Sequence, residues 1–237
     1  MTVGKVNTHI NTQLNPFGPQ WPNGKAEGVP TLGQQVQKVL FRGVKPPLLD
    51  PALFPEVAAQ LRLLRRYLKK LAVMAGDNED DYSVVLADGT IAMIDEAGTI
   101  YLGVGFLQKF AEKKEVLVGA LAHEVGHRPK RWNDYSQRQR LNDEELAAIC
   151  REEETRADIF AGRALAEMDL DCEPLAEFLL ALGDGSPKPH PEYFDAQTRS
   201  FIIREAHADR SYGTENRRKI FPEFERNKSP KGHLGDF

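Results

Sequence analysis

The sequence predicts an α+β fold, in which a small antiparallel sheet lies over a helix and the second half of the chain is mostly helical. Three observations predict it: an amphipathic helical pattern over residues 54–74, three short β-branched segments between residues 82 and 103, and helical patterns over most of the residues that follow. The 237 residues are 41% hydrophobic and 28% charged, a balance that is typical of a globular protein with a buried core.

The first 50 residues are expected to form an arm outside the main domain. They contain six prolines and six glycines, and no helical or strand period continues through them. A stretch of that length without secondary structure does not belong inside a compact domain. We therefore expect a Pro/Gly-rich N-terminal arm over residues 1–50, one domain over residues 51–226 and a flexible C-terminal tail over residues 227–237.

The elements of the domain follow from local patterns. Leu61, Leu64, Leu68 and Leu71 recur at helical spacing, and the basic residues of the same segment lie mostly on the other side. Turn residues separate the three β-branched segments, which indicates a meander in which neighbouring strands pair. Strands are expected over residues 82–87, 90–94 and 99–103, and helices over residues 104–113, 115–128, 143–168, 173–182 and 195–209.

Charge and cysteine content restrict the classes of function. Lys and Arg number 31 against 35 for Asp and Glu, so the net charge of −4 does not favour a nucleic-acid partner. Two cysteines cannot build a disulfide framework, which indicates a reducing compartment. Residues 1–13 do not resemble a secretory leader, and no apolar run is long enough to cross a bilayer. We expect a cytoplasmic protein with no integral membrane segment.

The motif His123-Glu124-Val125-Gly126-His127 carries the strongest chemical signal. Residues four apart lie on one face of a helix, so both imidazoles can bind one ion, and Glu124 can reach a water on that ion. The apolar run over residues 116–122 indicates a buried helix, where two imidazoles and a carboxylate without a metal would be costly. The alternative is a chance occurrence of the motif on a surface helix.

A second helix offers a third ligand. Glu154 and Asp158 are four residues apart, so they lie on one face of that helix. Glu154 would complete the set of two histidines and one glutamate that holds catalytic zinc in many enzymes. Asp158 could accept the spare N–H of a ligand imidazole. The alternative is a solvated, charged helix face, and that is what we expect of Glu152 and Glu153.

Residues 99–166 resemble the gluzincin metallopeptidases of the HtpX and CAAX-prenyl-endopeptidase type. Members of that group carry an apolar strand and helix before H-E-x-x-H, and then E-x-x-A-D on a later helix. Both motifs are matched here, at residues 123–127 and 154–158. A weaker match is His190-Pro191 followed by Arg199, where the group often has His-Pro and then an arginine in a helix. Without a spanning segment, the chain is more similar to the soluble minigluzincins.

The resemblance implies a zincin-like fold and a zinc-dependent endopeptidase that acts on peptides or proteins. His123, His127 and Glu154 would hold one zinc ion per chain, with Asp158 hydrogen-bonded behind a ligand imidazole. Glu124 would be the general base that takes a proton from the attacking water.

Two further expectations concern the C-terminal half and the chain ends. His190 is the first choice, ahead of Tyr193, His207 and Tyr212, for a catalytic residue that donates to an oxyanion. Some minigluzincins are held latent by their own terminal segments, so residues 1–48 and 228–237 are candidates for that role here.

Two other functions stay open as alternatives. A catalytically silent zinc-binding scaffold or protein-interaction module would keep the fold without turnover, although nothing in residues 123–158 is missing. A nucleic-acid accessory protein would use the basic residues between Arg62 and Lys70, and its affinity would fall steeply with salt. The acidic balance of the chain argues against the second of these.

Overall fold

The computed structural model describes residues 28–41, 44–135, 138, 140–183 and 191–208. Within these ranges the chain forms a three-stranded sheet and seven α-helices. This arrangement confirms the expected α+β class. The strands are β1 (Ser83–Ala87), β2 (Ala92–Ile94) and β3 (Thr99–Gly103). The helices are α1 (Leu32–Leu40), α2 (Ala58–Ala75), α3 (Val104–Lys109), α4 (Lys114–Gly126), α5 (Asp143–Glu167), α6 (Glu173–Gly183) and α7 (Ala196–Ala208). A 3₁₀ helix, η4 (Pro129–Asp134), follows α4.

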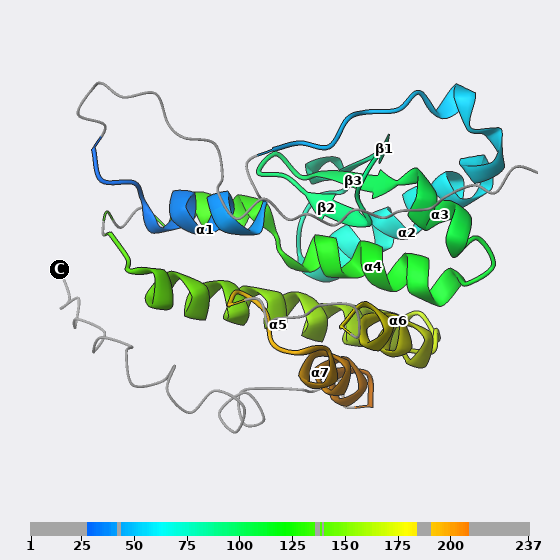
Figure 1. The fold of residues 1–237 in the computed structure, drawn as a ribbon. Coiled ribbons are helices and arrows are strands. Elements are labelled where there is room, and N and C mark those ends of the chain that lie inside the picture. Colours follow the sequence, from blue (N-terminus) through cyan, green and yellow to red (C-terminus); the bar gives the residue numbers. More distant parts are fainter. Residues whose placement is uncertain (1–27, 42–43, 136–137, 139, 184–190, 209–237) are drawn as a thin grey trace, which may run out of the picture.

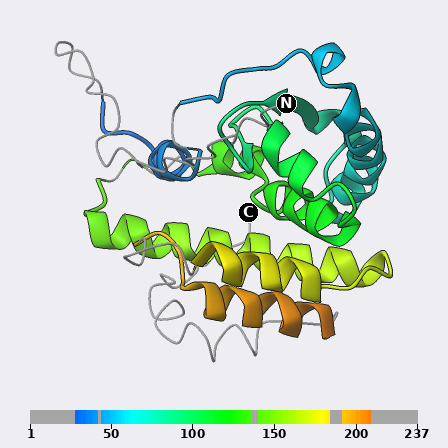
Figure 2. The same ribbon diagram turned by 45° about the vertical axis from the view of Figure 1, so that its right-hand side comes forward.

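Helix α4 lies between two layers of structure (Figure 1). The sheet and α2 pack on one side of it, while α5 packs on the other side and carries α7, with α6 beside α7. A second view shows the same stacking of α5, α6 and α7 beneath α4 (Figure 2). Because α4 is enclosed from both sides, residues 116–122 are all buried. That burial explains why the segment is apolar nearly all round.

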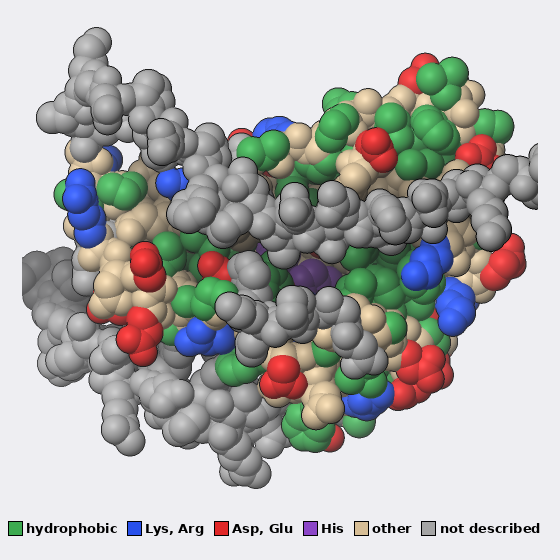
Figure 3. Space-filling view, viewed as in Figure 1, with side chains coloured by type: hydrophobic (Ala, Val, Ile, Leu, Met, Phe, Trp, Pro, Cys, Tyr) green, Lys and Arg blue, Asp and Glu red, His purple; other side chains and the backbone are tan. Residues whose placement is uncertain are grey.

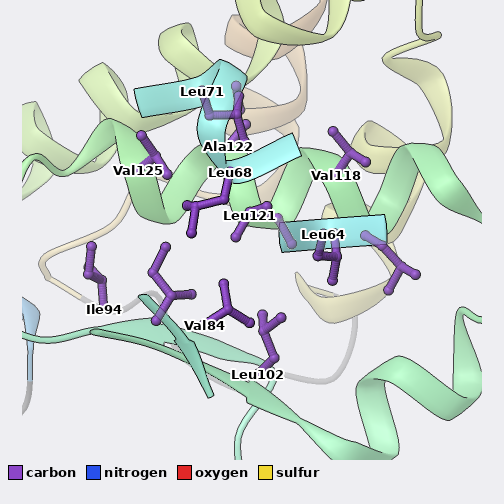
Figure 4. Close-up of a cluster of buried hydrophobic side chains, with 14 of the residues drawn as sticks. Leu64, Leu68, Leu71, Val84, Ile94, Leu102, Val118, Leu121, Ala122 and Val125 are labelled. Atoms are coloured by element: carbon purple, nitrogen blue, oxygen red, sulfur yellow. The ribbon is translucent and has the colours of Figure 1, made fainter. Parts of the chain in front are cut away.

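The inner face of the sheet forms the core with α2 and α4 (Figure 4). Side chains two residues apart on a strand point to the same face, and Val84, Ile94 and Leu102 on the face toward α4 are at most 6% exposed. The cluster includes Leu64, Leu68 and Leu71 from α2, Val118, Leu121, Ala122 and Val125 from α4, and Val84, Ile94 and Leu102 from the sheet. This packing holds the last turn of α4 against β2.

The strand order corrects the predicted meander. The order is β1–β3–β2, β1 pairs with β3 in parallel, and only β2 and β3 form an antiparallel pair. The connection from β1 to β2 crosses the end of β3 at Gly103, whose N–H donates to the Ile91 carbonyl. A Cβ at Gly103 would collide with the Thr90 carbonyl. The residues at 88–91 therefore do turn, but they form a crossover rather than a hairpin.

The first 50 residues also differ from the prediction, because they contain a helix. Thr31 and Gln34 form a capping box at the start of α1, and Val36 and Leu40 are buried. A nine-residue helix is marginal by itself in water, so packing on η4 and α5 must stabilise it. Farther along, the Leu49 N–H donates to the Leu86 carbonyl, which covers the outer edge of β1. The proposed domain boundaries stay predictions, and residues 1–27 and 227–237 lie outside the described residues.

Three prolines explain where helices α2 and α4 begin or end. The predicted helix over residues 54–74 begins only at Ala58, because Pro51 and Pro55 each start a 3₁₀ turn before it. Pro129 follows the end of α4, and Arg128 before it has a φ of 46°. Among the described helices, none is both long enough and apolar enough to cross a bilayer.

Candidate metal centre

Helices α4 and α5 bring the three predicted ligands together. His123 and His127 lie one turn apart at the end of α4, and Glu154 faces them from the middle of α5. The Nε2 atom of His123 is 3.2 Å from Oε2 of Glu154, and Nε2 of His127 is 3.6 Å from Oε1. One potential ligand atom from each residue lies within 4.8 Å of the other two. The two imidazole rings stand nearly perpendicular, at an angle of 86°.

The close approach of α4 and α5 depends on small residues. Gly126 lies inside the histidine motif and faces Ala157 on α5. A Cβ at Gly126 would be only 2.8 Å from the Ala157 Cα and 3.1 Å from the Phe160 Cβ. The absence of a side chain therefore allows the two helix backbones to approach, which places Glu154 within reach of both imidazoles.

Two charged residues lie behind His123. Asp158, one turn after Glu154, has its Oδ1 2.9 Å from Nδ1 of His123. Arg199 on α7 donates to both oxygens of Asp158, and its Nη2 is 3.4 Å from Oε2 of Glu154. The Arg199 guanidinium also lies over the Tyr193 ring, 5.3 Å from its centroid. Three helices thus contribute to the orientation of His123.

The charges around the cluster shift the pKa values of the two histidines in opposite directions. Burial opposes a positive charge on His123, but the carboxylates of Asp158 and Glu154 outweigh it and raise its pKa to about 10. Burial lowers the pKa of His127 to about 4. Burial also opposes the negative charge of Asp158, yet Arg199 and His123 lower its pKa to about 2. At neutral pH the metal-free cluster therefore pairs two carboxylates with two cations, protonated His123 and Arg199, while His127 is neutral. A metal ion would bind in place of the proton on His123.

Glu124 is in a different environment from the other carboxylates. Its side chain is buried, and burial raises its pKa to about 7. Its carboxylate accepts a hydrogen bond from the backbone N–H of Ile94, at the end of β2. A carboxylate whose pKa lies near neutrality is suited to take and return a proton.

The donor set fits a zinc ion. Two imidazoles and one carboxylate would be the three protein ligands typical of catalytic rather than structural zinc sites. The Oε2 atom of Glu154 is buried and has no hydrogen bond, although His123 Nε2 lies 3.2 Å away. Arg199 Nη2 is also 3.4 Å from this oxygen, so positive charge surrounds it without a well-directed hydrogen bond. A metal ion bound in place of the His123 proton would give the oxygen a direct ligand bond.

The surface around the centre is recessed. Figure 3 shows a histidine surface in a hollow between the upper and lower layers, with hydrophobic side chains on both sides. The His123 side chain is 15% exposed, whereas those of His127 and Glu154 are at most 6% exposed. The centre is therefore open to solvent mainly on the His123 side.

Two expectations about neighbouring residues have different outcomes. Glu152 and Glu153 were expected on a solvated face, and this is wrong: they are 5% and 1% exposed. Glu153 pairs with Arg131 and Arg156, and Arg156 also pairs with Glu152. Arg131 comes from η4, and α1 also packs on α5; the sequence patterns predicted neither contact. His190 lies outside the described residues, so its role stays a prediction.

Comparisons of this chain with protein-family models, with curated proteins and with solved structures found no match. The resemblance to the gluzincins therefore rests on the motif residues alone. The arrangement of His123, His127, Glu154 and Glu124 is the observation from which a function can be argued.

Proposed function

We propose that this chain is a zinc-dependent endopeptidase with a zincin-like fold. The observation that supports it is the convergence of His123, His127 and Glu154 on one point, with the Glu124 carboxylate on the next residue of the same helix. Such a set on two buried helices has no evident packing purpose, since burying it costs free energy. A hydrolytic metal centre would account for all four residues, three as metal ligands and Glu124 as the base.

The residues of the chain divide the work between binding and proton transfer. His123, His127 and Glu154 would hold the zinc ion. When bound, zinc acts as a Lewis acid, which lowers the pKa of water and polarises a carbonyl. Glu124 takes a proton from the attacking water and then delivers it to the leaving amine. Burial raises the pKa of this carboxyl in the metal-free chain, which favours a group that takes and returns a proton.

The edge of β2 offers a binding surface for an extended peptide. Ile91 and Asp95 direct their backbone groups toward β3, through bonds to Gly103 and Thr99. The backbone groups of Ala92, between them, therefore point away from the sheet. Among the described residues, no strand pairs with this edge of β2. A substrate strand could add here through main-chain hydrogen bonds, a mode that tolerates many side chains.

The experiment that tests this function compares wild type with Glu124→Gln on casein and on a peptide library, with and without a chelator. Glu124 is not a predicted ligand, so the variant should keep about one zinc per chain and lose hydrolysis. Wild type that binds zinc but cleaves nothing would instead favour the silent scaffold. A variant that cleaves as fast as wild type would show that the activity belongs to another site.

Latency through the chain ends stays a prediction, because residues 1–27 and 209–237 lie outside the described residues. The position of α1 in the core determines which truncations can test latency. A truncation that starts at Leu49 would remove Val36, Leu40 and Phe41, which are buried in the core. A truncation that starts at Gly28 leaves α1 in place, so a rise in turnover in that variant would report release of the cleft rather than loss of folding.

A further inference from the structure

The two predicted histidine ligands are held in different ways. Nδ1 of His123 lies 2.9 Å from a carboxylate oxygen of Asp158. Nδ1 of His127 is buried and has no hydrogen-bond partner among the described residues. Metal-binding histidines usually use the second ring nitrogen for a hydrogen bond that fixes the ring orientation. Something other than a hydrogen bond must orient His127.

Two rings stand edge-on to the His127 ring: that of His123, with centroids 4.8 Å apart, and that of Phe41. The Phe41 and His127 ring centroids are 6.2 Å apart and the ring planes meet at 80°, an edge-to-face arrangement. Phe41 is 5% exposed and His127 is 5% exposed, so the contact is closed to solvent. Edge-to-face pairs at this separation are favourable, because the positive ring edge of one partner meets the negative face of the other.

Phe41 is itself held in place, because it is the residue that ends α1. The helix is anchored at its start by the Thr31 capping box and in its middle by Val36, which is fully buried. Gln37 donates to the Pro129 carbonyl at 3.1 Å, which ties α1 to η4 directly after His127. At Gly33 the α1 backbone comes so close to the Trp132 carbonyl that a Cβ would collide with it. These contacts leave the Phe41 ring little freedom beside His127.

We infer that Phe41 is a positioning residue for His127, and that α1 is therefore part of the metal centre rather than an arm outside it. The inference rests on the proposed zinc site. The ring of Phe41 restricts the His127 imidazole to the rotamer in which Nε2 faces Glu154, 3.6 Å from Oε1. The entropy cost of ordering the His127 ring is therefore incurred during folding, so zinc binding does not incur it again.

The test measures the zinc affinity of the metal-free full chain by competition with a chromophoric chelator. Phe41→Leu keeps an apolar side chain but removes the ring, and it should raise the dissociation constant for zinc roughly 10-fold. Phe41→Tyr keeps the ring and should stay within about 2-fold of wild type. Leu107→Val removes apolar volume from α3, which packs on β3, so it should lower the urea midpoint and leave the zinc affinity near the wild-type value.

Two results would overturn the inference. One is a Phe41→Leu variant that binds zinc as tightly as Leu107→Val. The other comes from wild type alone, and so does not depend on whether a variant folds. In an imidazole nitrogen NMR spectrum, His127 should give one set of signals from one tautomer and one rotamer. Doubled or exchange-broadened His127 signals in an otherwise sharp spectrum would mean that Phe41 does not restrict the ring.

Failure of the zinc site itself gives a different pattern. If wild type and His127→Ala bind zinc equally, the proposed function is wrong, whatever the Phe41 variants do. If wild type binds one zinc, His127→Ala loses it and Phe41→Leu matches wild type, the site stands and only the role of Phe41 is wrong.

Discussion

Arg199 donates two hydrogen bonds to Asp158, from Nε to Oδ2 at 2.8 Å and from Nη2 to Oδ1 at 2.9 Å. The same Oδ1 atom lies 2.9 Å from Nδ1 of His123. One carboxylate therefore joins α7 to a predicted ligand on α4. Since Asp158 itself lies on α5, the orientation of His123 depends on the packing of three helices.

Removing any predicted ligand should remove the metal. Alanine at His123, His127 or Glu154 leaves two protein ligands, too few for tight binding of zinc. Elemental analysis of the purified proteins should find about one zinc per wild-type chain and much less in each variant. Stoichiometric zinc in all three variants would place the metal elsewhere.

Asp158→Asn should weaken zinc binding without abolishing it. The asparagine keeps an oxygen near His123 Nδ1 but loses the negative charge, and such changes typically cost 10–100-fold in metal affinity. Chelator competition measures this directly. A variant with wild-type affinity would mean that the contact between Asp158 and His123 does not support the ligand.

Arg199→Lys should also lower zinc affinity, by roughly 10-fold. Lysine keeps the charge but cannot make two parallel hydrogen bonds to Asp158, so the carboxylate would be less well oriented. Arg204→Lys is a matched control on the same helix, because Arg204 also donates twice to a carboxylate, that of Glu173, away from the centre. Equal losses in the two variants would indicate a general effect on α7.

Gly126→Ala should damage the site through the distance between α4 and α5. The added methyl group would lie 2.8 Å from the Ala157 Cα, so the helices must separate, at a cost of about 1–3 kcal/mol. Both zinc affinity and the free energy of unfolding should fall. Gly105→Ala in α3 is the control, since no atom lies within 4 Å of its added Cβ. That variant should be neutral or more stable by up to about 1 kcal/mol.

The sequence patterns predicted the parts of the site that lie within single helices. His123 and His127, like Glu154 and Asp158, are pairs at a spacing of four, and that spacing determines which side chains share a helix face. The patterns could not predict that Arg199 meets Asp158 or that Phe41 meets His127. Those pairs are 41 and 86 residues apart, and only tertiary packing brings them together.

The largest errors came from reading proline and glycine as signs of missing structure. Pro30 stands directly before Thr31, and the surrounding prolines and glycines make the Thr31–Gln34 capping box hard to recognise as the start of a helix. The burial of Glu153 involves Arg131 of η4, which is 22 residues away in the chain, so no helical spacing predicts that contact. The strand order failed for a related reason: the turn at Asp88-Gly89 suggests a hairpin, and only the contact of Thr90 with Gly103 shows a crossover.

Asp95 should make the stability of the protein dependent on acid pH. Burial alone would raise the pKa of this carboxyl, but hydrogen bonds from Lys45, Thr99, Tyr101 and Ala97 lower it below 3.8. The charged form therefore stabilises the fold above the unfolded-state pKa, and this contribution is lost as the pH falls through the folded-state pKa. Asp95→Asn should cost about 1–3 kcal/mol at pH 7.

Urea unfolding at several pH values checks this. The difference between wild type and Asp95→Asn should be full at neutral pH and should shrink below about pH 4. Asp80→Asn, at an exposed position, serves as the control and should change stability little at either pH. A gap for Asp95→Asn that stays constant down to pH 3 would mean that packing, rather than the charge, makes Asp95 important.

The strand order decides which backbone faces Glu124. In a meander β2 would be the central strand, and both of its sides would be occupied by neighbouring strands. Because β3 occupies the centre instead, the N–H of Ile94 is left for the Glu124 carboxylate. An insertion at residues 88–91 that let β2 move between β1 and β3 would keep every predicted ligand in the chain. The Ile94 N–H would then pair with a neighbouring strand and would no longer be available to the Glu124 carboxylate. The crossover at Gly103 therefore keeps the Ile94 N–H beside Glu124, where its hydrogen bond opposes part of the rise in the pKa of that carboxyl.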